Sequence, residues 1–237
     1  MTDMTNKIDH QFKQSASGKP YIDDNGVWIS IHPEAIKKSS QLRPALFLDR
    51  DGVINIDVNY LSKVEDVRLH DGASTMIAKA NALSIPVIVI TNQSGVGRGY
   101  FDWNTLGDVQ NEINRQLNQE GAHWDGVFAC PFHMDGLPPY NHDNHPYRKP
   151  NPGMLELAAD LFSIDLSRSW VIGDKADDLK SGINAGLCGG IHVNTRFREA
   201  EKERQEADNL KSSYFKVMTL TTVLEASHAL PLLTQEI

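Results

Sequence analysis

The stretch FLDRDGVIN, residues 47–55, joins the end of an apolar run to two aspartates, Asp49 and Asp51. Because alternate residues of an extended segment point to the same side, both carboxylates can face one site. Gly52 permits a tight turn where the chain leaves the strand. The stretch therefore predicts a buried strand that ends in a pair of carboxylates available for chemistry.

Short aliphatic runs alternate with helical patterns from Ala45 onward, as in a sheet built from strand–helix repeats. Most of the runs are continuously apolar, which is typical of strands covered on both faces. The pattern predicts an α/β fold, a three-layer α/β/α sandwich around a mainly parallel, Rossmann-like sheet. The expected strands are residues 45–49, 86–91, 126–130, 170–173, 189–193 and 215–220.

Amphipathic helices are expected between these strands, because apolar residues recur at helical spacing. Asn151 followed by Pro152 suits an N-cap and a first helical position, for a helix that runs to about Phe162. The two clearest apolar stripes are Ala73, Met76, Ile77, Ala80 and Leu83 in one helix, and Trp103, Leu106, Val109, Ile113 and Leu117 in the other.

Residues 1–44 differ from the rest of the chain, being polar and broken by Gly and Pro. Within them, residues 21–31 read YIDDNGVWISI, and Asn25-Gly26 is a strong hairpin-turn signal. We therefore expect an N-terminal extension, 1–44, with a small hairpin, followed by one main domain, 45–237. The hairpin is expected to cover a sheet edge or a dimer surface, or to act as a lid over the functional site.

The chain has 237 residues, a formal charge of −8 and a pI near 5.5. This acidic balance argues against broad binding to nucleic acid or to anionic lipid. The longest aliphatic run, residues 87–90, is far shorter than a membrane span, and the first residues lack an apolar signal core. Cys130 and Cys188 are expected to be thiols. We expect a cytoplasmic monomer or small homo-oligomer with no nucleic-acid or membrane partner.

Polar side chains follow other strands of the predicted sheet. Thr91 and Asn92 close the second strand and offer donors suited to phosphate, while Asp174 and Asp178 follow the fourth. Because ligands bind beyond the carboxyl ends of parallel strands, we expect these groups to meet Asp49 at one edge of the sheet.

Three clustered carboxylates, from Asp49, Asp51 and Asp174, need a cation. Each like-charged pair at 4 Å repels by about 4 kcal/mol at an effective dielectric near 20. Hard oxygen ligands in small number favour Mg²⁺, which also binds substrate phosphate. A phosphate needs a further positive group, and Lys149, just before a predicted helix, is the best candidate.

FLDRDGVIN, TNQSGVGRG, RKPNPGM and VIGDKADD together resemble the motifs of the haloacid dehalogenase-like (HAD) phosphatase superfamily. More narrowly, they resemble the bacterial D,D-heptose 1,7-bisphosphate phosphatases and the related histidinol-phosphate phosphatases. The resemblance covers about residues 45–193. The spacings of 42 and 58 positions between Asp49, Thr91 and Lys149 leave no room for a large cap domain.

The resemblance implies a Mg²⁺-dependent phosphomonoester hydrolase that acts on a small phosphorylated metabolite. It implies that Asp49 is the nucleophile, forming an aspartyl-phosphate, and that Asp51 is the general acid and then the base. Mg²⁺ would lie between Asp49, the backbone carbonyl of Asp51, and Asp174. The implied first substrate is D-glycero-D-manno-heptose 1,7-bisphosphate, losing its 7-phosphate, and the alternative is histidinol phosphate or another small sugar phosphate.

The resemblance also implies the groups that bind substrate. Thr91 and Lys149 would hold the transferring phosphoryl group with help from Asn92, and Asp178 would support Lys149 or the metal from behind. Arg148 and Arg98 are expected as substrate contacts. From a different class, the chain could be a phosphate-binding module without catalysis, although a pure binder does not need the second carboxylate of the aspartate pair.

The segment from 130 to 147 is predicted to be a functional loop, because it lacks periodicity in a compact domain. The resembled subgroup has a structural zinc loop here, but this sequence departs from it. The alternative is a loop ordered by proline, aromatic packing and histidine hydrogen bonds. The side chains that could form a tetrahedral Zn²⁺ site are Cys130, His133, His142 and His145.

Overall fold

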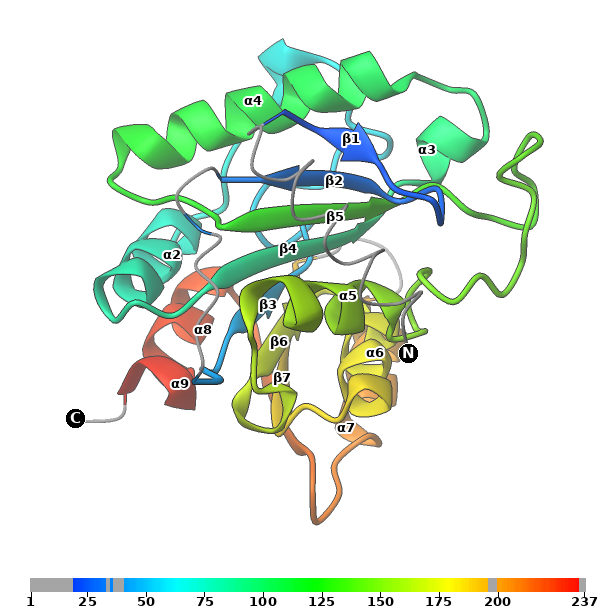
Figure 1. The fold of residues 1–237 in the computed structure, drawn as a ribbon. Coiled ribbons are helices and arrows are strands. Elements are labelled where there is room, and N and C mark those ends of the chain that lie inside the picture. The colour runs from blue at the N-terminus through cyan, green and yellow to red at the C-terminus, as the bar shows by residue number, and fades with distance from the viewer. Residues whose placement is uncertain (1–18, 33–34, 36–40, 196–199, 235–237) are drawn as a thin grey trace.

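The computed structural model describes residues 19–32, 35, 41–195 and 200–234 (Figure 1). The expectations for the first 18 residues lie outside this part of the chain. The described residues form one eight-stranded sheet with the order β1-β2-β5-β4-β3-β6-β7-β8, in which β3 to β8 are parallel. The six parallel strands are β3 (Leu46–Leu48), β4 (Val87–Asn92), β5 (Gly126–Cys130), β6 (Trp170–Gly173), β7 (Gly189–Val193) and β8 (Lys216–Leu220). The predicted strands are therefore confirmed within one or two residues at each end.

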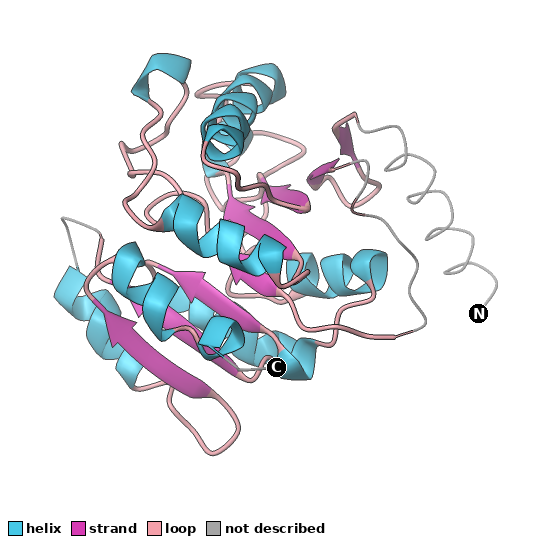
Figure 2. Ribbon diagram, turned by 90° about the vertical axis from the view of Figure 1, so that its left-hand side faces the viewer, coloured by secondary structure: helices cyan, strands magenta, loops and turns pink. Residues whose placement is uncertain are grey.

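Helices cover both faces of the sheet, so the predicted three-layer α/β/α sandwich is confirmed (Figures 1 and 2). On β3, Leu46 and Leu48 join one buried cluster and Phe47 joins the other, as alternation along a strand requires. The first cluster lies under α2 (Ala73–Ala82), α4 (Trp103–Gln119) and α8 (Val223–Ala229), and the second under α5 (Gly153–Phe162), α6 (Ala176–Ala185) and α7 (Ala200–Asp208). The short helices are η1 (Val64–Asp66), α3 (Ser94–Gly97), η2 (Leu166–Arg168) and α9 (Pro231–Thr234).

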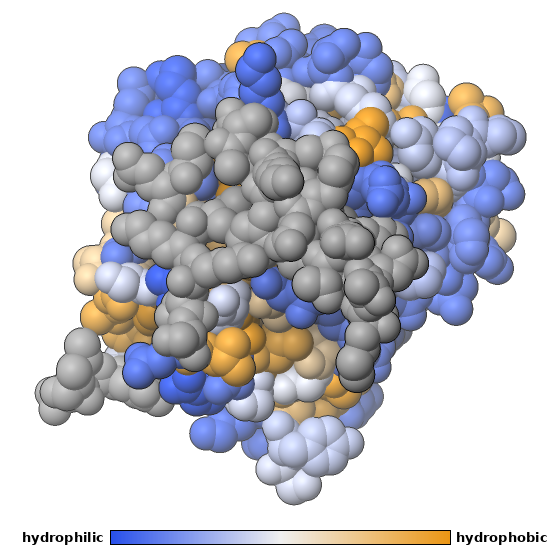
Figure 3. All heavy atoms as spheres, viewed as in Figure 1, coloured by the Kyte–Doolittle hydropathy of each residue, from blue (hydrophilic) through white to orange (hydrophobic). Residues whose placement is uncertain are grey.

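The long helix α4 shows how these layers are specified. Its stripe from Leu106 to Leu117 is buried as predicted, its outer face is hydrophilic (Figure 3), and Asp102 caps its first turn by accepting from Thr105 N at 2.8 Å. Two predicted members of the stripes lie at helix ends and are less buried. They are Trp103, which is partly buried, and Leu83, which is 37% exposed.

The start of α5 differs from the prediction. The helix begins at Gly153 with Pro152 at the N-cap, so Asn151 is not the capping residue. The Asn151 side chain donates instead to the backbone oxygen of His145 at 3.0 Å. It therefore ties the preceding loop together rather than the helix.

The N-terminal hairpin is part of the same sheet. Strands β1 (Tyr21–Ile22) and β2 (Trp28–Ile31) are antiparallel around a turn in which Gly26 has a φ of 77°, and β2 pairs antiparallel with β5. Ile29 is fully buried in the core cluster that contains Phe47. The hairpin thus extends the sheet beyond β5, while the division of the chain at residue 44 stays a prediction.

The connections on the functional side are short. Between β3 and β4 lie only η1 and α2, and between β4 and β5 lie only α3 and α4. Within residues 45–195, all of which are described, no further domain is inserted, and the prediction of an uncapped fold is confirmed. None of the helices in the described ranges combines the length and the apolar character that crossing a membrane would need.

Ile29→Ala tests whether the hairpin belongs to the cooperative fold. Removing a fully buried side chain should lower the free energy of unfolding by about 2–5 kcal/mol. Urea unfolding measured by circular dichroism gives this value. Ile22→Ala, in the 44% exposed side chain of β1, is the control and should change the free energy by less than about 0.5 kcal/mol. An unchanged global transition in Ile29→Ala would mean that the hairpin unfolds on its own.

Candidate active site

The predicted groups meet at the carboxyl ends of the three central strands. Asp49 follows β3 and its N–H donates to Ile172 O of β6 at 2.9 Å. Thr91 is at the end of β4, and Asp174 follows β6 directly. All three side chains are buried. The topology therefore brings together residues that are up to 125 positions apart.

Lys149 lies at the centre of this group. Its ammonium is 2.8 Å from an Asp49 oxygen and 2.6 Å from an Asp178 oxygen, and it donates to the backbone oxygen of Ile90 at 2.8 Å. The Lys149 side chain is 3% exposed. Burial lowers its pKa, but the two carboxylates outweigh this and raise the pKa above the usual lysine value, so the ammonium stays charged. Asp178 thus pairs with Lys149 directly.

Asp178 is positioned by the helix it starts. Its second oxygen accepts from Lys175 N at 3.0 Å in a capping box at the beginning of α6. Two glycines leave space for the buried acids. A Cβ on Gly52, which has a φ of 92°, would overlap the Asp174 carboxylate, and a Cβ on Gly173 would overlap Asp178. Only glycine fits at these two positions.

Asp51 is held by a separate network. Arg50 Nη2 lies 2.6 and 2.8 Å from its two oxygens, while Asn55 Nδ2 and Gln93 Nε2 donate at 2.9 Å each. Burial raises the pKa of Asp51, but the charge of Arg50 and these hydrogen bonds outweigh it and hold the pKa below its usual value. Gln93 also donates to the Thr91 hydroxyl at 2.8 Å. The network therefore links Asp51 to the end of β4.

Arg50 and Gln93 are not among the predicted site residues. Alternation along a strand would turn Arg50 away from the side that Asp49 and Asp51 share. The extended strand ends at Leu48, however, and the Arg50 carbonyl then accepts three successive N–H groups in a tight turn. The guanidinium consequently folds back on its neighbour. The available signal was an arginine between two aspartates at the end of an apolar strand.

Asn92 does not point a free amide into the site. Its Nδ2 donates to Lys149 O at 3.0 Å and its Oδ1 accepts from Lys149 N at 3.1 Å. The side chain therefore pairs with both polar backbone groups of Lys149 and fixes that residue opposite β4.

Two adjoining hollows open at this edge. One, of about 130 Å³, contains the Asp49 and Lys149 side chains, and the other, of about 190 Å³, contains Arg50 and Tyr60. The lining residues that both hollows share are Asp51, Asn92, Ser94 and Lys175. The smaller hollow has room for a phosphate group, and the second continues from it.

The donor set fits a hard divalent cation. Asp49, Asp174 and Asp178 offer buried carboxylate oxygens that lie within 4.8 Å of one another, and among the described residues this is the one such group. Three carboxylates exceed the single charge of Lys149, and oxygen donors suit Mg²⁺. The backbone carbonyl of Asp51, also expected as a ligand, stays a prediction, because this group contains side-chain atoms alone.

The two predicted arginines differ. Arg148 lines the smaller hollow and donates from Nη1 to Phe132 O at 2.9 Å. Arg98 lines neither hollow. It donates to the Tyr60 hydroxyl at 2.9 Å and pairs with Asp135 at 3.2 Å, so in this structure it joins two rim loops.

The four candidate zinc ligands do not form a metal site in the described structure. The Cys130 thiol is buried, which raises its pKa to about 12, and the His145 ring stacks on Phe132. The two ring nitrogens of His133 lie 2.8 and 3.0 Å from Nη2 of Arg98. The positive guanidinium of Arg98 would repel a metal ion at this position. His142 is exposed and meets His145 edge-on. The loop is ordered by aromatic packing and hydrogen bonds, the alternative that the sequence left open.

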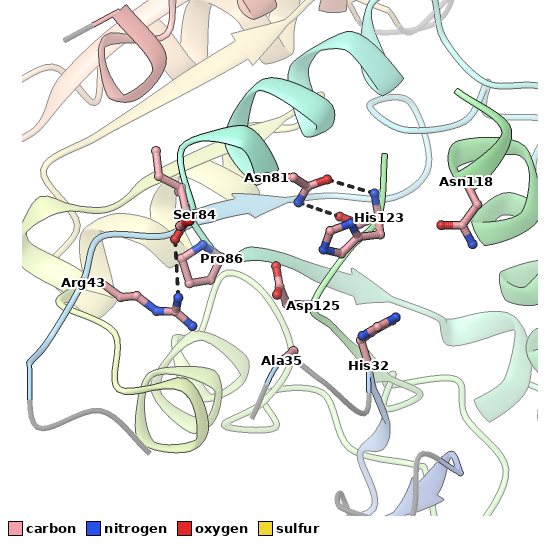
Figure 4. Close-up of a pocket in the computed structure, with 10 residues that line it drawn as sticks. His32, Ala35, Arg43, Asn81, Ser84, Pro86, Asn118, His123 and Asp125 are labelled. Carbon is pink, nitrogen blue, oxygen red and sulfur yellow. Dashed lines mark hydrogen bonds between the residues drawn. The ribbon is translucent and has the colours of Figure 1, made fainter. Parts of the chain in front are cut away.

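A wider cavity of about 420 Å³ lies at the opposite edge of the sheet, where β3, β4 and β5 begin (Figure 4). Several of its polar side chains form hydrogen bonds with the backbone of the protein. Asn81 bonds both backbone groups of His123, Arg43 donates to Ser84 O, and Asp125 accepts from Val87 N at 2.8 Å. Because ligands of such sheets bind at the carboxyl ends, the smaller hollow is the candidate active site.

Known proteins share this sequence and fold. The family model described as HAD-hydrolase-like matches residues 146–215. A D-glycero-β-D-manno-heptose-1,7-bisphosphate 7-phosphatase of Mesorhizobium japonicum is 42% identical over 180 residues, which cover 73% of this chain and 80% of that one. Other relatives are named for the α-anomer.

Solved structures agree. A protein of Mesorhizobium loti described as a HAD-like phosphatase superposes with a TM-score of 0.77 at 36% identity, over 90% of this chain and 97% of that one. The D,D-heptose 1,7-bisphosphate phosphatase of B. bronchiseptica, in complex with magnesium and phosphate, gives a TM-score of 0.65 at 28% identity, over 78% and 96%.

The fold, the aspartate pair and these matches define the chain as a HAD-like hydrolase. Within that class it belongs to the family of the D-glycero-D-manno-heptose-1,7-bisphosphate 7-phosphatases.

Asp49→Asn tests the electrostatics of the site without substrate. Burial raises the Asp49 pKa to about 7, Lys149 opposes this, and Asp178 and Asp51 add to it. Between the unfolded pKa and pH 7 the folded protein holds a proton that the unfolded chain has lost, so this carboxyl makes stability fall as the pH rises. With a chelator present to remove metal ions, the free energy of unfolding of Asp49→Asn at pH 8 should therefore exceed that of the wild type by roughly 2–4 kcal/mol.

Well below pH 3.8, the ordinary pKa of this carboxyl, the two proteins should unfold alike, since Asp49 is then protonated in both states. Urea unfolding at several pH values gives the comparison. Asp108→Asn, on the exposed face of α4, is the matched control and should follow the wild type at every pH. Equal stabilities of Asp49→Asn and wild type at pH 8 would contradict the burial of an ionised carboxylate.

Proposed function

We propose that this chain hydrolyses the 7-phosphate of D-glycero-D-manno-heptose 1,7-bisphosphate through an aspartyl-phosphate on Asp49. The observation that carries the proposal is the geometry around Lys149, which holds a buried carboxylate oxygen at 2.8 Å at the bottom of a phosphate-sized hollow. The family membership supplies the substrate.

In the first step an Asp49 oxygen attacks the phosphorus, and the bond from phosphorus to the sugar oxygen breaks. The transferring group spreads negative charge over its oxygens, and Lys149 and the Thr91 hydroxyl are placed to stabilise that charge. The hydrogen bonds from Asn92 to the Lys149 backbone keep the ammonium in place during the step.

Asp51 is assigned the proton transfers. It donates a proton to the leaving sugar oxygen, and in the second step it takes a proton from the water that attacks the aspartyl-phosphate and releases inorganic phosphate. Its lowered pKa leaves the carboxylate ionised, which is the state from which the second role begins. For the first role it must bind a proton, and an incoming phosphate dianion favours this by charge repulsion.

Mg²⁺ fits the carboxylates of Asp49, Asp174 and Asp178, and when bound it neutralises charge between the nucleophile and the phosphate. The second hollow, beside Tyr60 and Lys175, suits the sugar hydroxyls. Arg148 at the rim is assigned to the second phosphate.

The two free cysteines are typical of a reducing compartment, and we retain the cytoplasm as the proposed location. The oligomeric state stays a prediction.

Phosphate release from both anomers of the heptose bisphosphate, from histidinol phosphate and from simple sugar phosphates tests the function. The heptose bisphosphate should be preferred by more than about tenfold in kcat/KM, and activity should require added Mg²⁺. Asp49→Asn should lose at least about a thousandfold, and Asp108→Asn should match the wild type. Tight binding of phosphate without turnover would instead support the non-catalytic binding module.

Asp51→Asn separates proton transfer from attack. An alkyl phosphate needs its leaving oxygen protonated, whereas p-nitrophenyl phosphate does not, because its leaving group is a weak base. The variant should therefore lose about a hundredfold or more of kcat on the sugar phosphate and clearly less on the first turnover of the aryl ester. Equal losses of first-turnover rate on both substrates would remove Asp51 from the acid role.

A further inference from the structure

The rim loop from Phe132 to Arg148 is closed by a stacked pair of rings. The Phe132 and His145 ring centroids are 3.5 Å apart and the planes differ by 9°. Tyr140 packs edge-on against Phe132 at 5.6 Å, and Tyr147 lies 5.8 Å from His145. Burial and the neighbouring His142 lower the pKa of His145, which keeps the stacked imidazole neutral. The stack joins residues thirteen positions apart.

The turn of the N-terminal hairpin packs against this stack. A Cβ on Gly26 would lie 2.9 Å from the Phe132 ring, so the turn backbone is in close contact with the ring edge. Asn25 Nδ2 donates to the Tyr147 hydroxyl at 3.0 Å. Asp23 fixes the turn by accepting from Asn25 N at 3.0 Å and Val27 N at 2.9 Å. The hairpin and the loop therefore hold each other.

The stack leads directly to the site. Phe132 O accepts from Arg148 Nη1 at 2.9 Å, and His145 O accepts from Arg148 N at 2.9 Å. Both stacked residues thus accept hydrogen bonds from Arg148 through their backbone oxygens. The next residue is Lys149, whose ammonium pairs with Asp49. A shift of the stack would move these two cations, which both line the smaller hollow.

We propose that the Phe132–His145 stack, braced by the hairpin turn at Asn25 and Gly26, positions Arg148 and Lys149 in place of a bound metal ion. The proposal rests on the proposed function for its catalytic readout. His145 acts here as a positioning residue, since its ring contacts Phe132 while its backbone holds Arg148. Its Nδ1 already accepts from Tyr147 N at 3.3 Å.

Two variants of the stack and one of Cys130 separate positioning by the ring from metal binding. His145→Ala removes both the ring and any metal ligand, whereas His145→Phe keeps the stack and cannot bind metal. We expect His145→Ala to lose about tenfold or more in kcat/KM, since small misplacements of catalytic groups are costly. His145→Phe should recover to within about threefold of the wild type, and Cys130→Ala should stay in the same range.

Gly26→Ala tests the brace and has a matched control. Gly26 and Gly121 have φ values of 77° and 73°, so alanine strains the backbone alike at both, but nothing lies within 4 Å of a Cβ at Gly121. Both variants should lose thermal stability through this backbone strain, and Gly26→Ala should lose more because its Cβ also meets the Phe132 ring. Only Gly26→Ala should also lower kcat/KM and raise KM for the bisphosphate. Comparison of Gly26→Ala with Gly121→Ala therefore tests the positioning role even if His145→Ala fails to fold.

Two readouts are independent of turnover. Hydrogen exchange of the Arg148 and Lys149 amides should be faster in His145→Ala and Gly26→Ala than in wild type, His145→Phe and Gly121→Ala. Zinc analysis of the purified wild type should give far less than one ion per chain. If wild-type protein shows no phosphatase activity, the proposed function fails while the exchange and zinc data still judge the stack.

Stoichiometric zinc, together with equal losses in His145→Phe and His145→Ala, would overturn the proposal in favour of a metal site. Unchanged exchange and activity in His145→Ala would overturn it as well, because the stack would then position nothing.

Discussion

The buried ion pairs of Lys149 constrain the whole active-site edge. One ammonium pairs with Asp49 after β3 and with Asp178 in α6, and donates to Ile90 of β4. Leaving a buried charge without its partner costs about 3–5 kcal/mol. The three segments must therefore be placed together, and the parallel order of β4, β3 and β6 is the arrangement that does so.

The same pairs define what the site still attracts. The three carboxylates of Asp49, Asp174 and Asp178 and one ammonium leave a net charge of −2 when all are ionised. A divalent cation balances that charge, and a phosphate then meets the ion and Lys149 rather than bare carboxylates. Gly52 and Gly173 matter for this reason, since any larger side chain would displace an acid of the group.

How far the sequence predicts this arrangement depends on the kind of contact. The positions of Asp49, Thr91 and Asp174 follow from strand ends, which apolar runs locate well, and Lys149 follows from its place before a helix. Side-chain contacts within irregular segments have no periodic signal. The hydrogen bonds from Arg50 to Asp51 and the stacking of Phe132 on His145 depend on turns that are visible only in the folded chain. The zinc hypothesis for the loop rested on residue spacing alone, which does not show how the four side chains are arranged.

Since no domain of the described residues covers the site, its walls are loops, and the contacts that order these loops control access. Arg98 joins the loop of Tyr60, which borders the second hollow, to the loop of His133, and so it serves as a cross-link between walls rather than a group inside them. The hairpin turn at Gly26 packs against Phe132 in the second of these loops. Residues outside the family motifs, such as Gly26, thus help to hold the rim loops in place. Substrate selection therefore depends on these supporting residues as well as on those that touch substrate.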